Sequence, residues 1–207
     1  KAFTGQMLVL YIMSLKISKI RGNIDEKKYI EKIKNLKNLP HGIENSLKTE
    51  ELIQVFAKDF LSAKGSMFLG RGSSFPIALE GALKLKELSY LHAEGYPAGE
   101  MKHGPLALIE DGLPVIILAP KDKYFEKTVS NMQEVIARGG KVLLISDKHD
   151  EVINENIRFK IEMPYIDELL NPFLLTIPLQ LLAYHVALLK KCDIDKPRNL
   201  AKSVTVE

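Results

Sequence analysis

The stretch SMFLGRGSSFPIALEGALKLKELSYL, residues 66–91, decides the fold class of this chain. Met67 to Leu69 form a short apolar run, GRGSS forms a turn, and apolar residues from Phe75 onward recur at helical spacing. Pro76 falls in the first helical turn, where its missing N–H is tolerated. A buried strand that passes through a tight turn into a helix is the repeating unit of a parallel α/β sheet.

The same alternation continues along the rest of the chain. Further apolar strands are predicted at LPVIILAP (113–120), KVLLIS (141–146) and the shorter RFKIEM (158–163). A helix with Asp122 as N-cap and Gly139 as C-cap is predicted between the first two of these strands. A long apolar helix follows the last strand and is either kinked at its prolines or begins late. We therefore predict a doubly wound, mainly parallel α/β sheet flanked by helices.

Extra helices are predicted in front of this domain. Residues 2–19 read as an apolar helix, too short and interrupted to span a membrane. The next two helices are predicted to begin at the N-caps Asp25 and Thr49. Pro40 and Gly42 together should end the first of these, and Gly65 should end the second. The segment HAEGYPAGEMKHGP, residues 92–105, reads as an irregular loop because it is polar and rich in Gly and Pro.

Composition excludes several classes of protein. The chain has 207 residues, 46% hydrophobic and 27% charged, which is enough for one full-sized core and is typical of a globular protein. Its net charge of +3 is spread along the chain, so neither nucleic acid nor a membrane is an expected partner. The single cysteine, Cys192, is typical of a reducing compartment and predicts a cytoplasmic protein. No His or Cys spacing suggests a metal site.

Three stretches could carry chemistry, each with a plainer alternative. GRGSS precedes a helix N-terminus and could hold a phosphate, or could be only a tight turn; the residues favour neither. Lys84 and Glu87 share a helix face with Glu80 and could act on a substrate, or form a solvated ion-pair stripe. His103, between Lys102 and a Gly-Pro pair, is the best histidine for proton transfer, whereas His185 on the long apolar helix reads as a core histidine.

The C-terminal stretch KPRNLAKSVTVE, residues 196–207, has no helical or strand period. Lys202 lies among small residues and could form a Schiff base with a carbonyl if its pKa were lowered. Composition alone favours a polar tail.

Together these stretches resemble the C-terminal portion of the glutamine–fructose-6-phosphate aminotransferases, also called glucosamine-6-phosphate synthases. The strings that carry the resemblance are LGRGSSFPIALEGALKLKELSYLHAEGYPAGEMKHGPLALI, IPLQLLAYHVALLKKCDIDKPRNLAKSVTVE and the opening KAFT. The likeness covers essentially all 207 residues, and the tail and AGEMKHGPLALI are its most specific parts.

The resemblance implies a domain plan. Residues 49–192 would be the second of two sugar-isomerase (SIS) subdomains, residues 1–48 the helices that link it to the first, and residues 193–207 an active-site tail. A glutaminase domain and the first SIS subdomain, whose loop grips the substrate phosphate, would lie outside this chain. GRGSS would then be a structural echo of a phosphate loop. A homodimer is implied, and no metal or organic cofactor.

The resemblance also assigns roles to residues. Glu87 would move a proton between C1 and C2 of the sugar, and Lys84 would lie near the sugar oxygens. His103 would assist ring opening from the neighbouring subunit of the dimer. Lys202 would open the sugar as a Schiff base, with the main chain near Ala201 along the substrate. The implied reaction turns fructose 6-phosphate and glutamine-derived ammonia into glucosamine 6-phosphate.

Two other functions stay open at this point. SIS domains also serve as phosphosugar-binding regulatory modules, which would need Glu87 and Lys202 only for binding. A related sugar-phosphate deglycase or isomerase could use the same fold without glutamine, although the specific tail argues against it.

Overall fold

The computed structural model describes residues 2–147, 157 and 159–200. The helices in front of the sheet are α1 Ala2–Ile20, α2 Glu26–Lys37, α3 Leu39–Leu47 and α4 Glu50–Ala57, followed by the 3₁₀ turn η1 Lys58–Phe60. The strands are β1 Gly65–Gly70, β2 His92–Pro97, β3 Pro114–Leu118, β4 Lys141–Asp147 and β5 Phe159–Met163. The remaining helical elements are α5 Ser74–Ser89, η2 Ala98–His103, η3 Pro105–Leu108, α6 Phe125–Ile136, η4 Glu168–Leu170 and α7 Asn171–Leu189.

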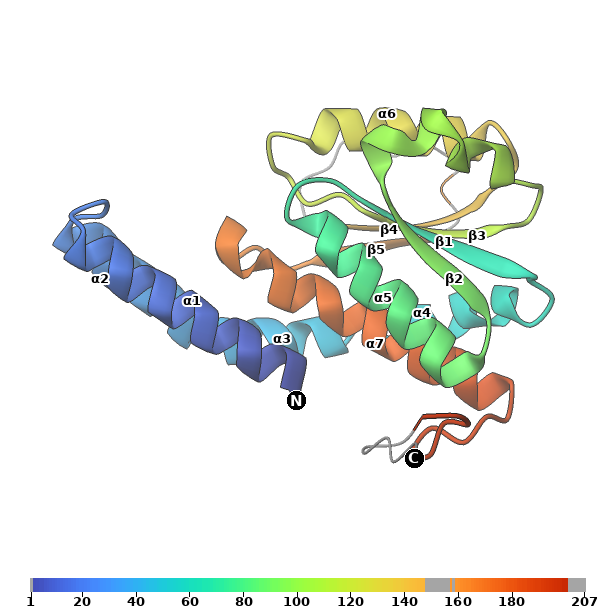
Figure 1. Ribbon diagram of the computed structural model, residues 1–207, viewed down its shortest axis with the longest axis horizontal. Coiled ribbons are helices and arrows are strands. Elements are labelled where there is room, and N and C mark those ends of the chain that lie inside the picture. Colours follow the sequence, from blue (N-terminus) through green and yellow to red (C-terminus); the bar gives the residue numbers. More distant parts are fainter. Residues whose placement is uncertain (1, 148–156, 158, 201–207) are drawn as a thin grey trace, which may run out of the picture.

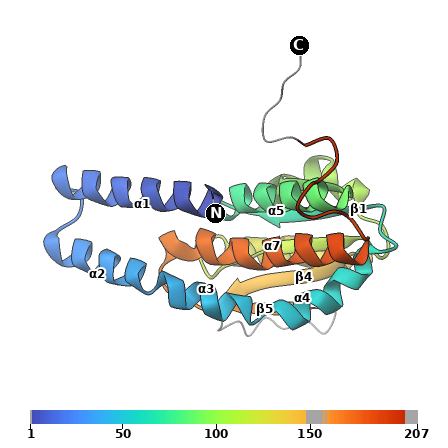
Figure 2. The same cartoon turned by 90° about the horizontal axis from the view of Figure 1, so that it is seen from below.

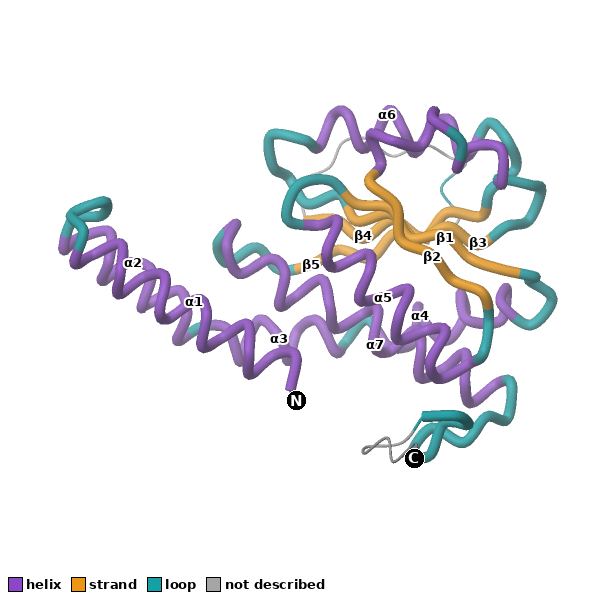
Figure 3. The backbone as a smooth tube through the Cα atoms, in the orientation of Figure 1, coloured by secondary structure: helices purple, strands orange, loops and turns teal. Residues whose placement is uncertain are grey.

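The five strands form one parallel sheet in the order β2-β1-β3-β4-β5. Helices cover both of its faces: α6 lies on one side, and α4, α5 and α7 on the other (Figure 1, Figure 3). The doubly wound fold predicted from the sequence is therefore confirmed. This strand order reverses direction between β1 and β3, where ligands of doubly wound folds usually bind.

Alternate residues of each central strand supply the two halves of the core. In β1, Phe68 faces α5 and α7, whereas Met67 and Leu69 face α6. Phe56 of α4 is fully buried and packs edge-on against Phe60 and Phe159, with ring centroids 5.4 and 5.5 Å apart. Because strands buried on both faces need apolar side chains at every position, the central strands were readable as continuous apolar runs.

One prediction about this region is wrong. Residues 92–97 form the edge strand β2, which pairs with β1, and residues 98–103 form η2. Among the described strands, β2 has a partner on one side only. Its position at the edge leaves side chains such as Glu94 and Tyr96 only partly buried, so polar residues are tolerated there. A polar segment can therefore form a strand at the edge of a sheet, because an edge strand does not need the continuous apolar pattern of a central strand.

Several predicted helix ends also differ. Pro40 and Gly42 lie inside α3, Pro40 in its first turn and Gly42 where a Cβ would meet the Ile166 side chain. Thr49 precedes α4, but its hydroxyl donates to the Ser46 carbonyl instead of capping the helix. Asp25 does cap α2, accepting from the Lys28 N–H at 2.7 Å.

The ends of the later helices shift by a few residues. Asp122 accepts from the N–H of Tyr124, the residue that precedes α6, so it fixes the turn before the helix. Gly139 lies three residues beyond the last residue of α6, with φ at +81°. Gly65 begins β1 rather than ending α4. The long apolar helix begins late, at Asn171.

The helices α1 and α2 form a hairpin that extends away from the domain (Figure 1, Figure 2). Leu15 is the one buried residue among the described residues of α1. Exposed apolar side chains of α1 are Val9, Leu10, Ile12, Met13, Ile17 and Ile20. The base of the hairpin is held by Asp167, which caps η4 and accepts hydrogen bonds from Lys32 of α2 at 2.6 Å and Asn35 at 3.0 Å.

The segment Glu168–Leu189, which contains α7, is long and apolar enough to cross a membrane by length and composition. Most of it is buried between α5 on one side and α3 and α4 on the other (Figure 2). This burial is that of a core helix.

Candidate active site

Lys84 and Glu87 meet on the C-terminal half of α5. The Lys84 Nζ lies 2.7 Å from the Glu87 carboxylate and 3.8 Å from that of Glu80. The spacing of three and four residues places these side chains on one helix face, as the sequence predicted. About 30% of the Lys84 and Glu87 side chains is exposed, 31% and 29% respectively. The pair is therefore open to a bound molecule, and its ion pair adds little to stability.

His103 does not meet this pair within one chain. It is exposed at the end of η2, beyond the carboxyl end of β2. The helix α5 begins after the carboxyl end of β1 and ends at Ser89, just before the amino end of β2. Glu87 lies thirteen residues along α5 from Ser74, which corresponds to about 20 Å of helix. Glu87 and His103 thus lie near opposite ends of the strands, Glu87 close to the amino end of β2 and His103 beyond its carboxyl end.

The neighbourhood of His103 belongs to the other layer of the domain. Met101 of η2 is buried in the core cluster that includes Met132 of α6. Lys102 lies 3.0 Å from the Glu134 carboxylate of α6. His103 is therefore carried by a short helix that packs on α6, and not by the layer that carries Lys84.

The C-terminal tail is described as far as Leu200, and Ala201 and Lys202 lie outside the described residues. The Arg198 N–H donates to the Tyr90 hydroxyl at 2.8 Å, and its guanidinium carbon lies 4.1 Å from the centre of the Tyr90 ring. Tyr90 follows Glu87 by three residues. The described part of the tail therefore returns to the end of α5 that carries Lys84 and Glu87. Nothing in the sequence pattern identified Tyr90, whose partner is more than one hundred residues away.

The GRGSS turn lies at the reversal point of the sheet. Gly72 has φ at +52° and lies against the Tyr124 ring, while Arg71 packs its guanidinium on Gly99. The Ser74 hydroxyl is buried and has no hydrogen-bond partner among the described residues. The turn joins β1 to α5 as predicted.

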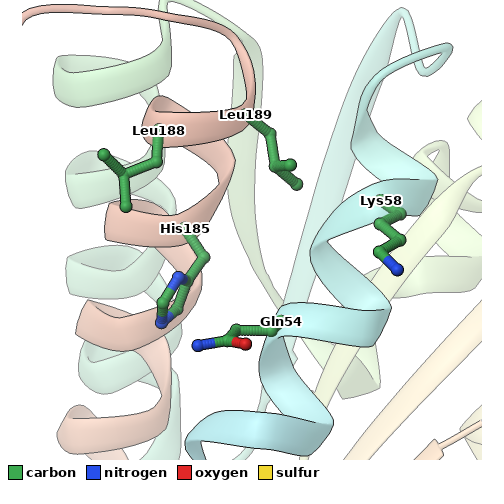
Figure 4. A pocket seen from close by; sticks show the side chains of 5 residues that line it. All are labelled: Gln54, Lys58, His185, Leu188 and Leu189. Atoms are coloured by element: carbon green, nitrogen blue, oxygen red, sulfur yellow. The ribbon is translucent and has the colours of Figure 1, made fainter.

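Of the other described histidines, His185 lies in a structural position. His185 is buried and its Nε2 lies 2.9 Å from the Glu50 carboxylate, in line with a core histidine. It lines a cavity of about 300 Å³ between α4 and α7 (Figure 4). His41 lies in α3 and His92 begins β2. The fifth, His149, lies outside the described residues.

None of the candidate catalytic residues Lys84, Glu87 and His103 lines the cavity beside His185, whose lining is Gln54, Lys58, His185, Leu188 and Leu189. Within residues 2–147, 157 and 159–200, no group of three or more His, Cys, Asp or Glu side chains could hold a metal ion. Glu87 with Lys84 therefore remains the strongest candidate centre in the described part of the chain.

Strand order and side-chain placement together define a doubly wound α/β domain with a carboxylate–lysine pair suited to proton transfer. Residues 59–190 match the sequence model described as "SIS domain". This chain belongs to the SIS domain family.

Comparison with known sequences and structures shows which members of the SIS domain family this chain resembles. The chain is 50% identical over its whole length to glutamine–fructose-6-phosphate aminotransferase (isomerizing) of Bartonella quintana. It spans only 34% of that relative's length. Among solved structures, the C-terminal domain of glucosamine-fructose-6-phosphate aminotransferase from Francisella tularensis is 43% identical with a TM-score of 0.91. That match covers 94% of this chain and 55% of the other. The resemblance read from the sequence is confirmed.

A more distant structural relative is named as a deaminase and not as an aminotransferase. Glucosamine-6-phosphate deaminase from Thermotoga maritima is 26% identical with a TM-score of 0.64, over 90% of this chain and 52% of that protein.

Proposed function

We propose that this chain is the second SIS half of an enzyme that makes glucosamine 6-phosphate from fructose 6-phosphate and glutamine-derived ammonia. The observation that carries the proposal is the 2.7 Å contact between Lys84 and Glu87 in a chain 50% identical throughout to such aminotransferases. Residues 49–192 form the SIS domain, residues 1–48 link it to a first SIS subdomain, and residues 193–207 form an active-site tail.

The proposed chemistry divides the work among four side chains. The Lys202 amine condenses with the open-chain ketone and releases water, which gives a Schiff base. Ammonia then displaces the lysine and leaves the fructose imine. The Glu87 carboxylate takes a proton from C1 and returns it to C2, while Lys84 stabilises negative charge on the sugar oxygens. The main chain at Ala201 lies along the substrate.

His103 assists ring opening from a second copy of the chain. The separation of Glu87 and His103 within one chain supports this arrangement, because a complete site then requires a neighbour. A two-fold dimer supplies two such sites from one interface.

The partners follow from the same proposal. A glutaminase domain supplies ammonia, and the first SIS subdomain supplies the phosphate grip. The exposed apolar side chains of α1 support a covering subdomain, since a helix that is apolar on every side is normally buried. The enzyme works in the cytoplasm, binds neither nucleic acid nor membrane, and needs no metal or organic cofactor.

A test replaces the proposed base without changing its shape. In the full-length enzyme, Glu87→Gln should abolish the formation of glucosamine 6-phosphate while fructose 6-phosphate still binds. The matched control Glu51→Gln removes an exposed carboxylate of α4 and should leave turnover unchanged. Normal turnover of the Glu87→Gln enzyme would show that Glu87 is not the base.

A sugar-phosphate deglycase or deaminase is the second candidate, and the likeness to the Thermotoga maritima deaminase favours it. It predicts turnover of glucosamine 6-phosphate without any need for glutamine. Assaying the full-length enzyme in both directions, with and without glutamine, separates the two. A regulatory phosphosugar-binding module predicts binding without turnover in either assay.

A further inference from the structure

The tail after α7 is bent by hydrogen bonds among its own residues and is attached to the domain through Arg198. The Asp193 carboxylate accepts hydrogen bonds from the N–H groups of Asp195 and Lys196, which bends the chain back toward α5. Among the described tail residues 193–200, the Arg198 N–H makes the one hydrogen bond to another element, and its acceptor is the Tyr90 hydroxyl. The Arg198 guanidinium also lies over the Tyr90 ring, at cation–π distance.

Tyr90 adopts an unusual backbone conformation for its residue type. It caps α5 with φ at +60° and ψ at +17°, in the left-handed region that normally takes glycine at a helix end. A bulky side chain is disfavoured there, and such strain persists only where the surroundings compensate for it. The described compensation is the contact of the side chain with Arg198, because the helix-capping N–H bond to the Lys86 carbonyl would form with glycine equally well.

We propose that Tyr90 is a positioning residue that clamps the tail at Arg198 beside the Lys84–Glu87 pair. The inference rests on the proposed function, in which Lys202 must reach the same substrate as Glu87. Tyr90 follows Glu87 by three residues, so the clamp fixes the tail one helical turn from the proposed base. Lys202 follows Arg198 by four residues, and four residues can span at most about 14 Å, so a held Arg198 limits how far the proposed Schiff-base lysine can be from the clamp.

One substitution, Tyr90→Gly, distinguishes a positioning role for Tyr90 from a purely structural one. Tyr90→Gly relieves the left-handed conformation and removes the clamp together. If Tyr90 only ended α5, this variant would be at least as stable and fully active. If Tyr90 positions the tail, the variant stays folded but loses turnover.

The first measurement is independent of activity and uses the full-length enzyme. Trypsin can cut the bond between Arg198 and Asn199 only when the tail leaves the clamp, and the peptide ending at Arg198 is quantified by mass spectrometry. Tyr90→Gly should raise this cleavage rate about five- to thirty-fold, which corresponds to a clamp of roughly 1–2 kcal/mol. Tyr90→Phe keeps the ring and loses the acceptor, so its rise should be smaller. Tyr184→Phe on α7 is the control and should cleave at the wild-type rate.

The second measurement follows the reaction. Borohydride traps a Schiff base between fructose 6-phosphate and Lys202, and Tyr90→Gly should slow this trapping and lower kcat by a similar factor with little change in KM. Arg198→Lys, made with Tyr90 intact, keeps the backbone N–H and a cation over the ring, and should retain most of both wild-type rates.

The Tyr90–Arg198 clamp and the proposed function are refuted by different results. Wild-type rates of tail cleavage and trapping in Tyr90→Gly would overturn the clamp. Faster cleavage with wild-type kcat would overturn its positioning role. Absence of trapping at Lys202 in the wild-type enzyme would overturn the proposed function, while the cleavage rates would still decide whether the clamp exists.

Discussion

The ion pair between Lys32 and Asp167 gives the sharpest stability prediction. Its two charged atoms are 2.6 Å apart, and only 5% of the Asp167 side chain and 19% of the Lys32 side chain is exposed. Lys32→Met removes the cation and leaves the carboxylate buried, and its remaining hydrogen bonds among the described residues come from Asn35 and the Leu169 N–H. We expect this variant to weaken the attachment of the α1–α2 hairpin to the rest of the domain.

The size of the effect follows from the burial of the pair. Removing one partner of a buried ion pair costs about 3–5 kcal/mol, and water reaching Lys32 places this case near 3 kcal/mol. For a domain of this length, about 3 kcal/mol corresponds to a fall in Tm of about 6–12 °C. The double variant Lys32→Met/Asp167→Asn should recover most of the loss, because a neutral amide oxygen still accepts from the Leu169 N–H.

Circular dichroism melts measure the global loss, and hydrogen exchange of the α2 amides reports detachment of the hairpin alone. Lys19→Met is the matched control, because the Lys19–Glu26 pair of the same hairpin is 39% and 64% exposed and should change stability by less than about 0.5 kcal/mol. The reasoning is refuted if Lys32→Met melts and exchanges like the wild type, or if the double variant is no more stable than the single one.

Three further predictions concern the same hairpin. Burial alone would raise the pKa of Asp167, but hydrogen bonds from Lys32, the Leu169 N–H and Asn35 lower it below 3.8. The stability from Asp167 is therefore complete above pH 4 and lost as the pH falls through the lower folded value, so Asp167→Asn should flatten the acid end of a stability–pH curve. Burial and the Asp167 charge raise the pKa of Tyr11 to about 12, and its buried hydroxyl has no hydrogen-bond partner among the described residues. Tyr11→Phe should therefore raise the free energy of unfolding by about 1 kcal/mol in denaturant titration, and a loss would reveal a hidden partner. Val9→Lys with Ile17→Lys should leave this chain's Tm unchanged but lower that of the full-length enzyme, and equal Tm values there would show that α1 is not covered.

The parts of the fold that could be predicted are those whose signal is local. The apolar runs of β1, β3 and β4 and the helical spacing of α5 are contained in a few consecutive residues. The meeting of Lys84 with Glu87 was predictable for the same reason, since their spacing fixes a shared helix face.

The remaining features depend on residues far apart in the sequence. The strand β2 was missed because an edge strand lacks the apolar pattern of a central one. The distance between Glu87 and His103 depends on the direction of α5 relative to β2, which no short pattern encodes. The contacts of Tyr90 with Arg198 and of Lys32 with Asp167 join segments separated by 108 and 135 positions.

The enclosure of α7 between α5, α3 and α4 has a consequence for synthesis on the ribosome. These three helices emerge before α7, and the sheet face covered by α4 and α5 cannot close until α7 joins them. A nascent chain that has reached β5 therefore presents an apolar sheet face with its covering helix not yet made, which is a state prone to aggregation and a substrate for chaperones. A ribosome stalled before Asn171 should hold a protease-sensitive chain, and one stalled after α7 has cleared the exit tunnel should hold a resistant domain.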